Sequence, residues 1–293
     1  VYLTELEQDS LKKSINENKA QYLLAGILHN ILDFNKYEGD EPYPLVHAWM
    51  PTTELSSFFD LKKERPNIVF IVMDGLGADF INQKGKFKGF SPFIDSLATH
   101  SLYWENYLTN TTSHTDAIPT IFGSLPFGTA GFTNTESSVD RNTLFGLLKK
   151  NGYQTSFYTG LNTSLEQLDL FLEEEQLDIV VDKSSFHESV TLQKDDQAGN
   201  SLGYPDEAIY TKWGQSYQLT DVPKLEVFVN VSSTKPYMHP GKERYLNRID
   251  KQIEAKQFDR STIRLVKNNK EAFASRGYSD DALKSFFEKY RQT

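Results

Sequence analysis

The sequence has no cysteine, and this absence excludes several kinds of chemistry at once. Its 293 residues can form no disulfide, offer no thiolate to a metal ion and hold no cysteine nucleophile. The sequence also lacks any run of about 18 apolar residues, the length that a membrane-spanning helix needs. Positive charge is scarce, because 31 Lys and Arg face 40 Asp and Glu and leave a net charge of −9. Since duplex binding requires clustered Lys and Arg, we expect no nucleic-acid partner.

The chain does contain enough apolar material for a packed core. Hydrophobic residues make up 38% of the chain and aromatic residues 13%, a composition that argues against global disorder. Residues 1–60 combine a helical pattern with several prolines. We expect them to form a helical and extended lead-in packed on a main domain that spans 61–293.

Apolar runs alternate with helical patterns over the main domain, which predicts an α/β fold with a mostly parallel, doubly wound sheet. The six apolar residues from Ile68 to Met73 are typical of a central strand buried on both faces. Further strands are expected at 103–108, 154–158, 178–181 and 225–231, and helices at 91–102, 116–122, 143–150, 165–175 and within 245–293.

A carboxylate directly follows the first predicted strand. In open parallel sheets, ligands bind beyond the carboxyl ends of the strands, where Asp74 is expected to lie. Gly75 and Gly77 allow the backbone to turn tightly there and to approach a ligand. A carboxylate in this place can hold a divalent metal ion through oxygen, and the alternative is an Asp that only caps a turn. The residues alone leave both interpretations open.

A second polar group, from Asn110 to Asp116, precedes a predicted helix. The start of a helix offers free N–H groups and the positive end of the dipole, which suit a phosphate or sulfate. A Ser or Thr there, with its oxygen on a metal ion, can lose its proton and attack phosphorus or sulfur. Ordinary capping of the helix is the alternative, and for this segment alone it is the stronger one.

The two motifs, with the segments between and after them, resemble the alkaline phosphatase and sulfatase superfamily, and within it the lipoteichoic-acid-synthase-like branch. The resemblance runs from about residue 40 to the end of the chain and depends on the order and spacing of several segments. These are Pro66–Gly77 (first strand and metal carboxylate), Ser91–Ala98, Pro119–Pro126 (nucleophile helix), Thr143–Thr155 and Leu225–Tyr237 (later strand and loop).

The resemblance implies a threonine nucleophile, because the Cys/Ser-x-Pro-x-Arg signature of the aldehyde-dependent sulfatases is absent. In the threonine branch the nucleophile lies about five residues before the position of Pro119, where this chain has His114 between Ser113 and Thr115. We therefore expect Thr115 to be the nucleophile and a metal ligand, with Ser113 as the alternative and His114 least favoured. Asp74 is expected to be the metal carboxylate, and the ion to be Mn, Zn or Mg.

Several features depart from the family pattern. Thr234 stands where the family usually has a His before a Pro-Tyr pair, and 159–163 lack the His and Trp-x-Arg that grip glycerol phosphate in lipoteichoic-acid synthases. The Asp-His pair that completes the family's metal site occurs nowhere in the chain. We therefore expect a domain that stops before its C-terminal part and binds the ion weakly or not at all. His239 could replace the missing His, but a surface position is the favoured interpretation.

The resemblance implies a metal-dependent phosphotransferase, or a hydrolase of phosphate or sulfate esters, that acts on an envelope or lipid-linked substrate. The alternative is a non-catalytic binding domain of the same fold. The resemblance also implies an extracytoplasmic location, periplasmic or at the cell surface, with a membrane anchor upstream of residue 1. An incomplete sheet would leave an open edge, so we expect self-association through that edge.

Overall fold

The computed structural model describes residues 58, 65–81, 84–111, 114–124, 142–164, 168–188, 190–193, 201–255 and 258–293. All of them belong to one compact unit, which comprises residues 48–135 and 141–293. The predicted lead-in at 1–60 lies outside the described residues, except for Phe58. The boundary near residue 61 therefore stays a prediction.

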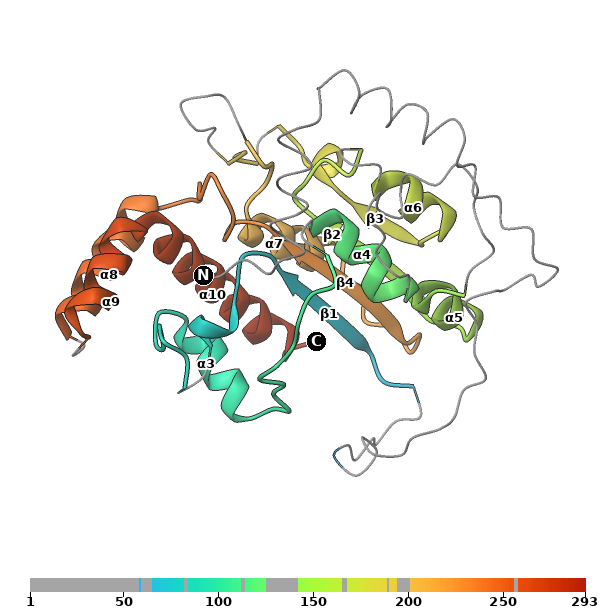
Figure 1. Cartoon of the computed structure of the whole chain (residues 1–293). Helices are drawn as coiled ribbons and strands as arrows, with labels where there is room; N and C mark the ends of the chain where they lie inside the picture. Colours follow the sequence, from blue (N-terminus) through green and yellow to red (C-terminus); the bar gives the residue numbers. More distant parts are fainter. Residues whose placement is uncertain are drawn as a thin grey trace, which may run out of the picture. The chain divides into compact units, whose positions relative to one another are not determined.

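Four parallel strands form the sheet of the described residues (Figure 1). Their order across the sheet is β1-β4-β2-β3, and their bounds are Ile68–Met73 for β1, Gln154–Thr159 for β2, Ile179–Val181 for β3 and Lys224–Asn230 for β4. Val227 of β4 lies opposite Phe70 of β1 on one side and Phe157 of β2 on the other. Every pairing is parallel, which confirms the predicted α/β fold with a parallel sheet.

Helices cover both faces of the sheet, as the doubly wound interpretation predicts (Figure 1). One face carries α4 (His114–Gly123), α5 (Leu144–Lys150) and α6 (Leu168–Glu174). The other carries α3 (Pro92–Thr99), α7 (Asp206–Ser216) and α10 (Lys270–Tyr290). Because crossovers must join parallel strands, the loops that can carry chemistry collect at the strand ends.

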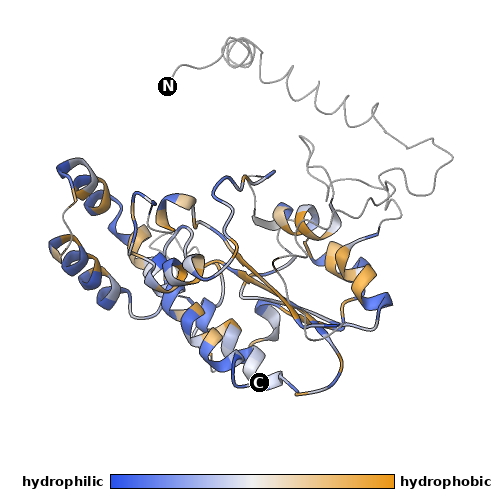
Figure 2. Cartoon of the chain, turned by 90° about the horizontal axis from the view of Figure 1, so that it is seen from below, coloured by the Kyte–Doolittle hydropathy of each residue, from blue (hydrophilic) through white to orange (hydrophobic). Residues whose placement is uncertain are grey.

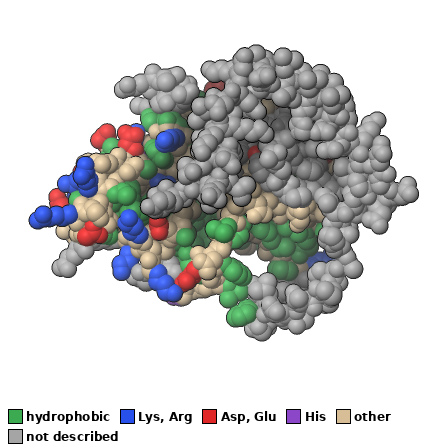
Figure 3. Space-filling view, in the orientation of Figure 1, with side chains coloured by type: hydrophobic (Ala, Val, Ile, Leu, Met, Phe, Trp, Pro, Cys, Tyr) green, Lys and Arg blue, Asp and Glu red, His purple; other side chains and the backbone are tan. Residues whose placement is uncertain are grey.

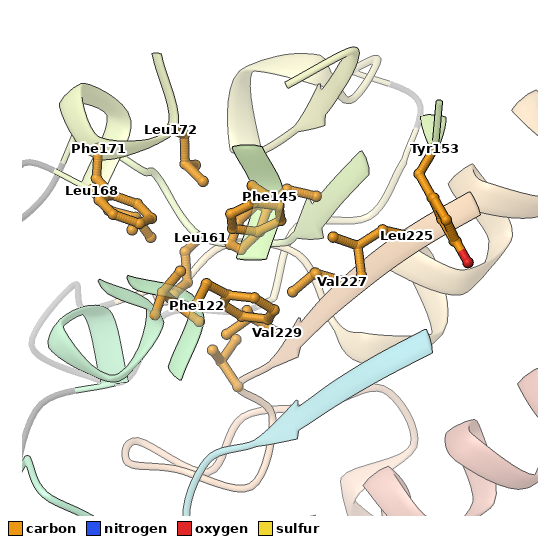
Figure 4. Close-up of a cluster of buried hydrophobic side chains, with 13 residues drawn as sticks. Phe122, Phe145, Tyr153, Leu161, Leu168, Phe171, Leu172, Leu225, Val227 and Val229 are labelled. Atoms are coloured by element: carbon orange, nitrogen blue, oxygen red, sulfur yellow. The ribbon is translucent and has the colours of Figure 1, made fainter. Parts of the chain in front are cut away.

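Side chains of β4 alternate between the two faces and so divide the core into two clusters. Val227 faces the first cluster, where it meets Phe122 of α4 and Phe145 of α5 (Figure 4). Phe228 faces the second and packs on Phe286 of α10, with ring centres 4.9 Å apart. Hydrophobic residues accordingly gather along the strands (Figure 2). Burial on both faces explains why β4 is buried along its whole length.

A third cluster joins the C-terminal helices to the segment after β1. Here α8 (Lys242–Ala255) and α9 (Arg260–Asn268) pack beside the start of α10, and Phe273 of α10 meets Phe87 and Phe90. Lys and Arg are interspersed with Asp and Glu over the outer surface of α8 and α9 (Figure 3). Two short 3-10 helices complete the described elements, η2 at Ala78–Phe80 and η4 at Lys183–Ser185.

The place of β1 in the sheet differs from the prediction. β1 stands at the end of the described order instead of its middle, and its six residues are half-buried. Among the described residues, β4 is its only strand partner. An apolar run indicates that a strand is shielded from water, but the run alone does not identify the neighbouring elements that shield it.

The strand predicted at 103–108 is wrong, because this segment has no regular secondary structure. Its pattern is aromatic and suits a strand, yet it pairs with none of the described strands. Trp104, Tyr107 and Leu108 are consequently exposed, by 61%, 75% and 84%. The segment connects α3 to α4 across the edge of the unit next to β1 (Figure 1).

The sequence patterns also fail to predict α7. Its apolar residues are few, and the helix is held instead by deep burial of Ile209 and Trp213. A usable signal is present at its start, where Pro205 precedes two acidic residues, Asp206 and Glu207, in the first turn. Negative charge in that position favours a helix N-terminus.

Candidate functional site

Asp74 lies at the carboxyl edge of the sheet, as its position after β1 predicts. Its backbone N–H donates to the carbonyl oxygen of Asn230, the last residue of β4, at 3.2 Å. The hydroxyl of Ser233 donates to the carbonyl oxygen of Asp74 from the loop that follows β4. The ends of β1 and β4 are therefore joined directly behind the Asp74 carboxylate.

Of the two glycines after Asp74, only one is required by the backbone. Gly75 has φ +75°, and a Cβ there would lie 2.7 Å from the carbonyl oxygen of Ser233. Gly77 is extended, and a Cβ would meet nothing within 4 Å. The tight turn and the close approach of the β4 loop thus depend on Gly75 alone.

The loop after β4 is held from behind by a buried carboxylate. Oδ1 of Asp206, at the start of α7, accepts the backbone N–H groups of Val231 and Ser232, each at 3.1 Å. Oδ2 accepts the hydroxyl of Ser279 in α10 at 2.7 Å. Burial raises the pKa of the Asp206 carboxyl above its usual value, and the bonds from Ser279, Ser232 and Val231 oppose that rise. Asp206 therefore fixes the loop to two helices, a positioning role that its sequence context did not indicate.

Thr234 has no ring nitrogen that could bind a metal ion or a substrate, and its hydroxyl is used within its own turn. Its hydroxyl donates to the carbonyl oxygen of Val231 at 2.8 Å, and its backbone N–H reaches the same oxygen at 3.1 Å. Both groups serve the turn that leads to Tyr237, whose φ is +58°. The side chain of Thr234, where the resemblance leads us to expect a histidine, is therefore a structural element of the loop.

His239 is buried, so the surface interpretation is wrong. The residue is 7% exposed, and its ring stacks on Tyr278 and meets the edge of Tyr245. Nδ1 lies 3.1 Å from the carbonyl oxygen of Pro240 and donates to it, whereas Nε2 has no hydrogen-bond partner. Burial lowers the pKa of the His239 imidazole. Tyr245, six residues later, and Tyr278 of α10 create this environment, which the sequence pattern did not reveal.

The positively charged side chain of Arg276, which the sequence patterns did not single out, lies at the carboxyl edge of the sheet near Asp74. Arg276 of α10 donates from Nε to the carbonyl oxygen of Gly75 at 2.8 Å and from Nη1 to that of Ala272 at 2.7 Å. Its guanidinium lies 4.4 Å from the ring centre of Phe80. Burial lowers the pKa of Arg276, while Tyr237 and the charge of Asp74 raise it. Arg276 and Asp74 are more than 200 positions apart, and only the packing of α10 brings them together.

The hydroxyl cluster is described only in part. Ser113 lies outside the described residues, and for His114 and Thr115 the structure describes the backbone but not the side chains. Thr115 is the second residue of α4. This helix begins at the end of the sheet toward which β1 points (Figure 1). The expected closeness of the Asp74 and Thr115 side chains stays a prediction.

The described residues do not by themselves make a metal centre. No three His, Cys, Asp or Glu side chains come together in the part of the chain that the structure describes. Asp74 supplies one carboxylate, Thr234 has no ring nitrogen, and the guanidinium of Arg276 lies close by. A tight divalent site needs more protein ligands than one carboxylate.

A cavity of about 570 Å³ lies at the opposite edge of the sheet. Its lining includes Gln154 and Lys224, the first residues of β2 and β4, together with Asp178 just before β3. Because the strands are parallel, these residues mark the amino edge. The cavity is therefore separate from the site around Asp74.

A family model described as Sulfatase matches residues 66–293. The chain belongs to the sulfatase family. The match begins just before β1 and includes Asp74, α4, the loop after β4 and Arg276, so every part of the candidate site lies in the sulfatase-family domain. No match was found among curated proteins.

Several solved structures share the fold. A protein in the alkaline phosphatase superfamily from Vibrio parahaemolyticus has a TM-score of 0.58 and 22% identity over 80% of this chain and 52% of its own. The lipoteichoic acid synthase LtaP of Listeria monocytogenes has a TM-score of 0.57 and 16% identity over 78% and 52%. The C-terminal periplasmic domain of EcEptC from Escherichia coli, solved with Zn, has a TM-score of 0.53 and 11% identity over 78% and 60%.

The sulfatase-family domain described here spans about half the length of the first two of these structures. The likeness to these structures confirms the predicted fold, and the family model confirms the predicted sulfatase relationship. In the described part of the chain, none of the helices has the length and apolar character that crossing a bilayer requires.

Proposed function

We propose that this domain transfers or hydrolyses a phosphate or sulfate ester through a covalent intermediate on the hydroxyl of Thr115. The observation that supports the proposal most is the position of Asp74 at the carboxyl edge, next to the loop after β4. Thr115 is in the first turn of a helix that begins at that end of the sheet. Free N–H groups in a first helical turn favour a transferred anionic group.

The proposed reaction has two steps. The oxygen of Thr115 forms a bond to phosphorus or sulfur while the bond to the leaving alcohol oxygen breaks. The threonine proton passes to solvent, and the leaving oxygen takes up a proton. Water or an acceptor alcohol then attacks the phosphorylated or sulfated threonine and restores its hydroxyl. Ser113 remains the alternative nucleophile.

The proposal includes dependence on a divalent ion, Mn, Zn or Mg, with Asp74 and Thr115 as ligands. Its support is the typical behaviour of the family and the Zn complex of the EcEptC domain. Since the described residues provide a single carboxylate there, we expect the 293-residue chain to bind such an ion weakly.

The proposal extends to substrate and place. We propose an envelope or lipid-linked ester as substrate, and an extracytoplasmic location with a membrane anchor upstream of residue 1. The support is the likeness to LtaP, a lipoteichoic acid synthase, and to the EcEptC domain, which is periplasmic. We further propose self-association along the edge of β1 that pairs with no described strand, because an edge strand presents unpaired backbone groups.

The experiment that tests the proposed chemistry uses the 293-residue chain with bis(4-nitrophenyl) phosphate and Mn²⁺ or Zn²⁺. Peptide mass spectrometry is expected to find a 4-nitrophenylphosphoryl adduct on Thr115 after acid quenching, with one nitrophenol released for each adduct. Thr115→Ala should abolish the adduct, and Asp74→Asn should reduce its formation by at least about tenfold, the effect of losing roughly 1.4 kcal/mol of transition-state stabilisation. Thr120→Ala, in the same helix, is the matched control and should leave the adduct in place.

An adduct on Ser113 that survives in Thr115→Ala would move the nucleophile to Ser113. Absence of any adduct and any nitrophenol release, with a folded chain and millimolar metal, would reject the catalytic proposal.

The second candidate is a non-catalytic binding domain of the same fold, and specific observations favour it. The hydroxyl of Thr234, at the family's histidine position, is used by its own turn. The described residues also contain no cluster of three metal-binding side chains. This candidate predicts that the chain binds an ester without turning it over.

A further inference from the structure

Arg276 is anchored so that its guanidinium has a fixed direction. Its Nε and Nη1 donate to the carbonyl oxygens of Gly75 and Ala272, which use two of its five N–H donors. The face of Phe80 lies under the guanidinium at 4.4 Å. A planar group held by two hydrogen bonds and a ring loses little further entropy when it binds a ligand.

The anchored guanidinium lies beside Asp74, where a positive charge would attract an anionic substrate. It is bonded to the turn that directly follows Asp74, and the charge of Asp74 acts on it. Tyr237, in the loop after β4, is a further hydrogen-bond partner of this guanidinium, so about two of the five N–H donors remain for a ligand. The guanidinium therefore lies where the end of β1, the loop after β4 and α10 meet, and its remaining N–H donors lie at this junction.

The charge balance at this junction limits the ligand. The whole chain carries a net charge of −9, and the Asp74 carboxylate adds local repulsion for any anion. An arginine retains its positive charge at any ordinary pH and binds phosphate or sulfate oxygens through paired N–H groups. One guanidinium beside one carboxylate suits a singly charged ester better than a doubly charged one.

We propose that Arg276 binds an oxyanion of the substrate at the Asp74 edge, and that the preferred substrate is a singly charged ester, a phosphodiester or a sulfate monoester. This inference rests on the proposed function and adds a protein cation to it. Arg276 then supplies, without a metal ion, part of the positive charge that holds the ester next to Asp74.

The test measures binding of diphenyl phosphate to the 293-residue chain by NMR titration at low salt, with EDTA present. Wild-type protein is expected to bind it saturably and to bind phenyl phosphate, which is doubly charged, more weakly. Arg276→Gln should weaken binding of the diester at least about tenfold, since it removes the positive charge and its charge-assisted hydrogen bonds to the phosphate. Arg276→Lys should retain part of the affinity. Arg264→Gln removes an exposed arginine of α9 and is the matched control, with wild-type affinity expected.

Asp74→Asn separates this inference from the metal proposal. If Arg276 holds the anion, this variant binds the diester as well as wild type or better in EDTA, because a repelling carboxylate is gone. Binding that requires Mn²⁺, is lost in Asp74→Asn and is unchanged in Arg276→Gln would overturn the role of Arg276 and leave the proposed function standing. Arg276-dependent binding with no threonine adduct would reject the proposed catalysis and retain the anion site.

Arg276→Gln could fail to fold, since it loses bonds to two carbonyl oxygens. A second measurement therefore uses wild-type protein alone. Phenylglyoxal modifies accessible arginines, and peptide mass spectrometry reports each site. Diphenyl phosphate is expected to protect Arg276 and not Arg264, and equal modification of Arg276 with and without the diester would overturn the proposal.

Discussion

At the scale of single residues, Gly75 and Gly77 share one turn but differ in backbone conformation and in the space available for a side chain. The φ of +75° and the nearby Ser233 carbonyl oxygen exclude a side chain at Gly75, whereas Gly77 is extended with open space around it. The two positions therefore form a matched pair for testing how the Asp74 turn is held.

We expect Gly75→Ala to lower the free energy of unfolding by about 2 kcal/mol or more, because it combines a left-handed backbone with a 2.7 Å clash. Gly77→Ala should be neutral or stabilise by up to about 1 kcal/mol through the unfolded chain. Urea denaturation of both variants measures the difference. Equal stability of the two would show that the turn is not built as described.

Arg276 and His239 show how residues gain a role only through their neighbours. Nothing in the sequence distinguishes Arg276 from other charged residues of the C-terminal helices, and its significance comes from the bond to Gly75. His239 lies in a segment of prolines and lysines that suggests the surface, yet Tyr278 and Tyr245 enclose it. Both environments depend on α10 reaching the loop after β4.

At the scale of elements, a single carboxylate ties α10 to the start of α3. Asp280 accepts hydrogen bonds from the backbone N–H groups of Phe93 and Ile94, at 3.0 and 2.8 Å. These N–H groups lie in the first turn of α3, where the helix itself offers them no acceptor. Burial raises the pKa of the Asp280 carboxyl to about 6, because it outweighs the bonds from Phe93 and Ile94. The protonated acid is therefore favoured in the folded state relative to the unfolded chain.

This pKa gives a pH-dependent stability with a definite sign. The folded pKa of about 6 exceeds the ordinary value of 3.8, so the stabilising contribution is complete below pH 4 and is lost as the pH rises through 6. The whole change is on the order of 3 kcal/mol for a shift of this size. We therefore expect the difference in free energy of unfolding, wild type minus Asp280→Asn, to fall as the pH rises from about 4 to above 6.

Chemical denaturation at pH 4, 5, 6 and 7 measures that difference. Subtracting the variant removes the contributions of other titrating groups, including Asp206 and Glu226, whose pKa values burial also raises. A wild-type minus variant difference that is flat from pH 4 to 7 would contradict the assignment. A difference that rises with pH would mean that Asp280 is ionised in the fold and that its bonds to α3 dominate.

At the scale of the whole molecule, two features lie on the side of the sheet where β1 ends the described order. β1 is apolar but only half-buried, and the segment 103–108, which passes next to β1 (Figure 1), exposes Trp104, Tyr107 and Leu108. An apolar edge strand and an exposed aromatic segment are both features that promote association.

We therefore predict that the purified chain forms dimers or larger species at micromolar concentrations. Replacing Trp104, Tyr107 and Leu108 together by Ser should weaken this association with little loss of monomer stability, since the three side chains are largely exposed. Leu219→Ser, at an exposed leucine between α7 and β4, is the control and should change nothing. Light scattering coupled to size exclusion measures the mass, and a wild-type monomer at 100 µM would reject the prediction.

The sequence by itself determined the fold class, the main strands and the place of Asp74. Apolar runs and helical periodicity report local burial, which dictates strands and helices directly, and a residue after a parallel strand must lie at the carboxyl edge. The helix expected at 143–150, for example, is α5 at Leu144–Lys150, and Thr143 caps it, with Gly146 N–H donating to its hydroxyl at 3.0 Å.

Only the tertiary structure decided which residues gather around that edge. The aromatic segment 103–108 has the composition of a strand but lacks a neighbour to pair with, and a strand exists only through its partners. Asp206, His239 and Arg276 likewise owe their surroundings to contacts made by α10 and the loop after β4. Such contacts join residues distant in the chain, and no local pattern encodes them, because burial and charge at a site depend on everything that packs against it.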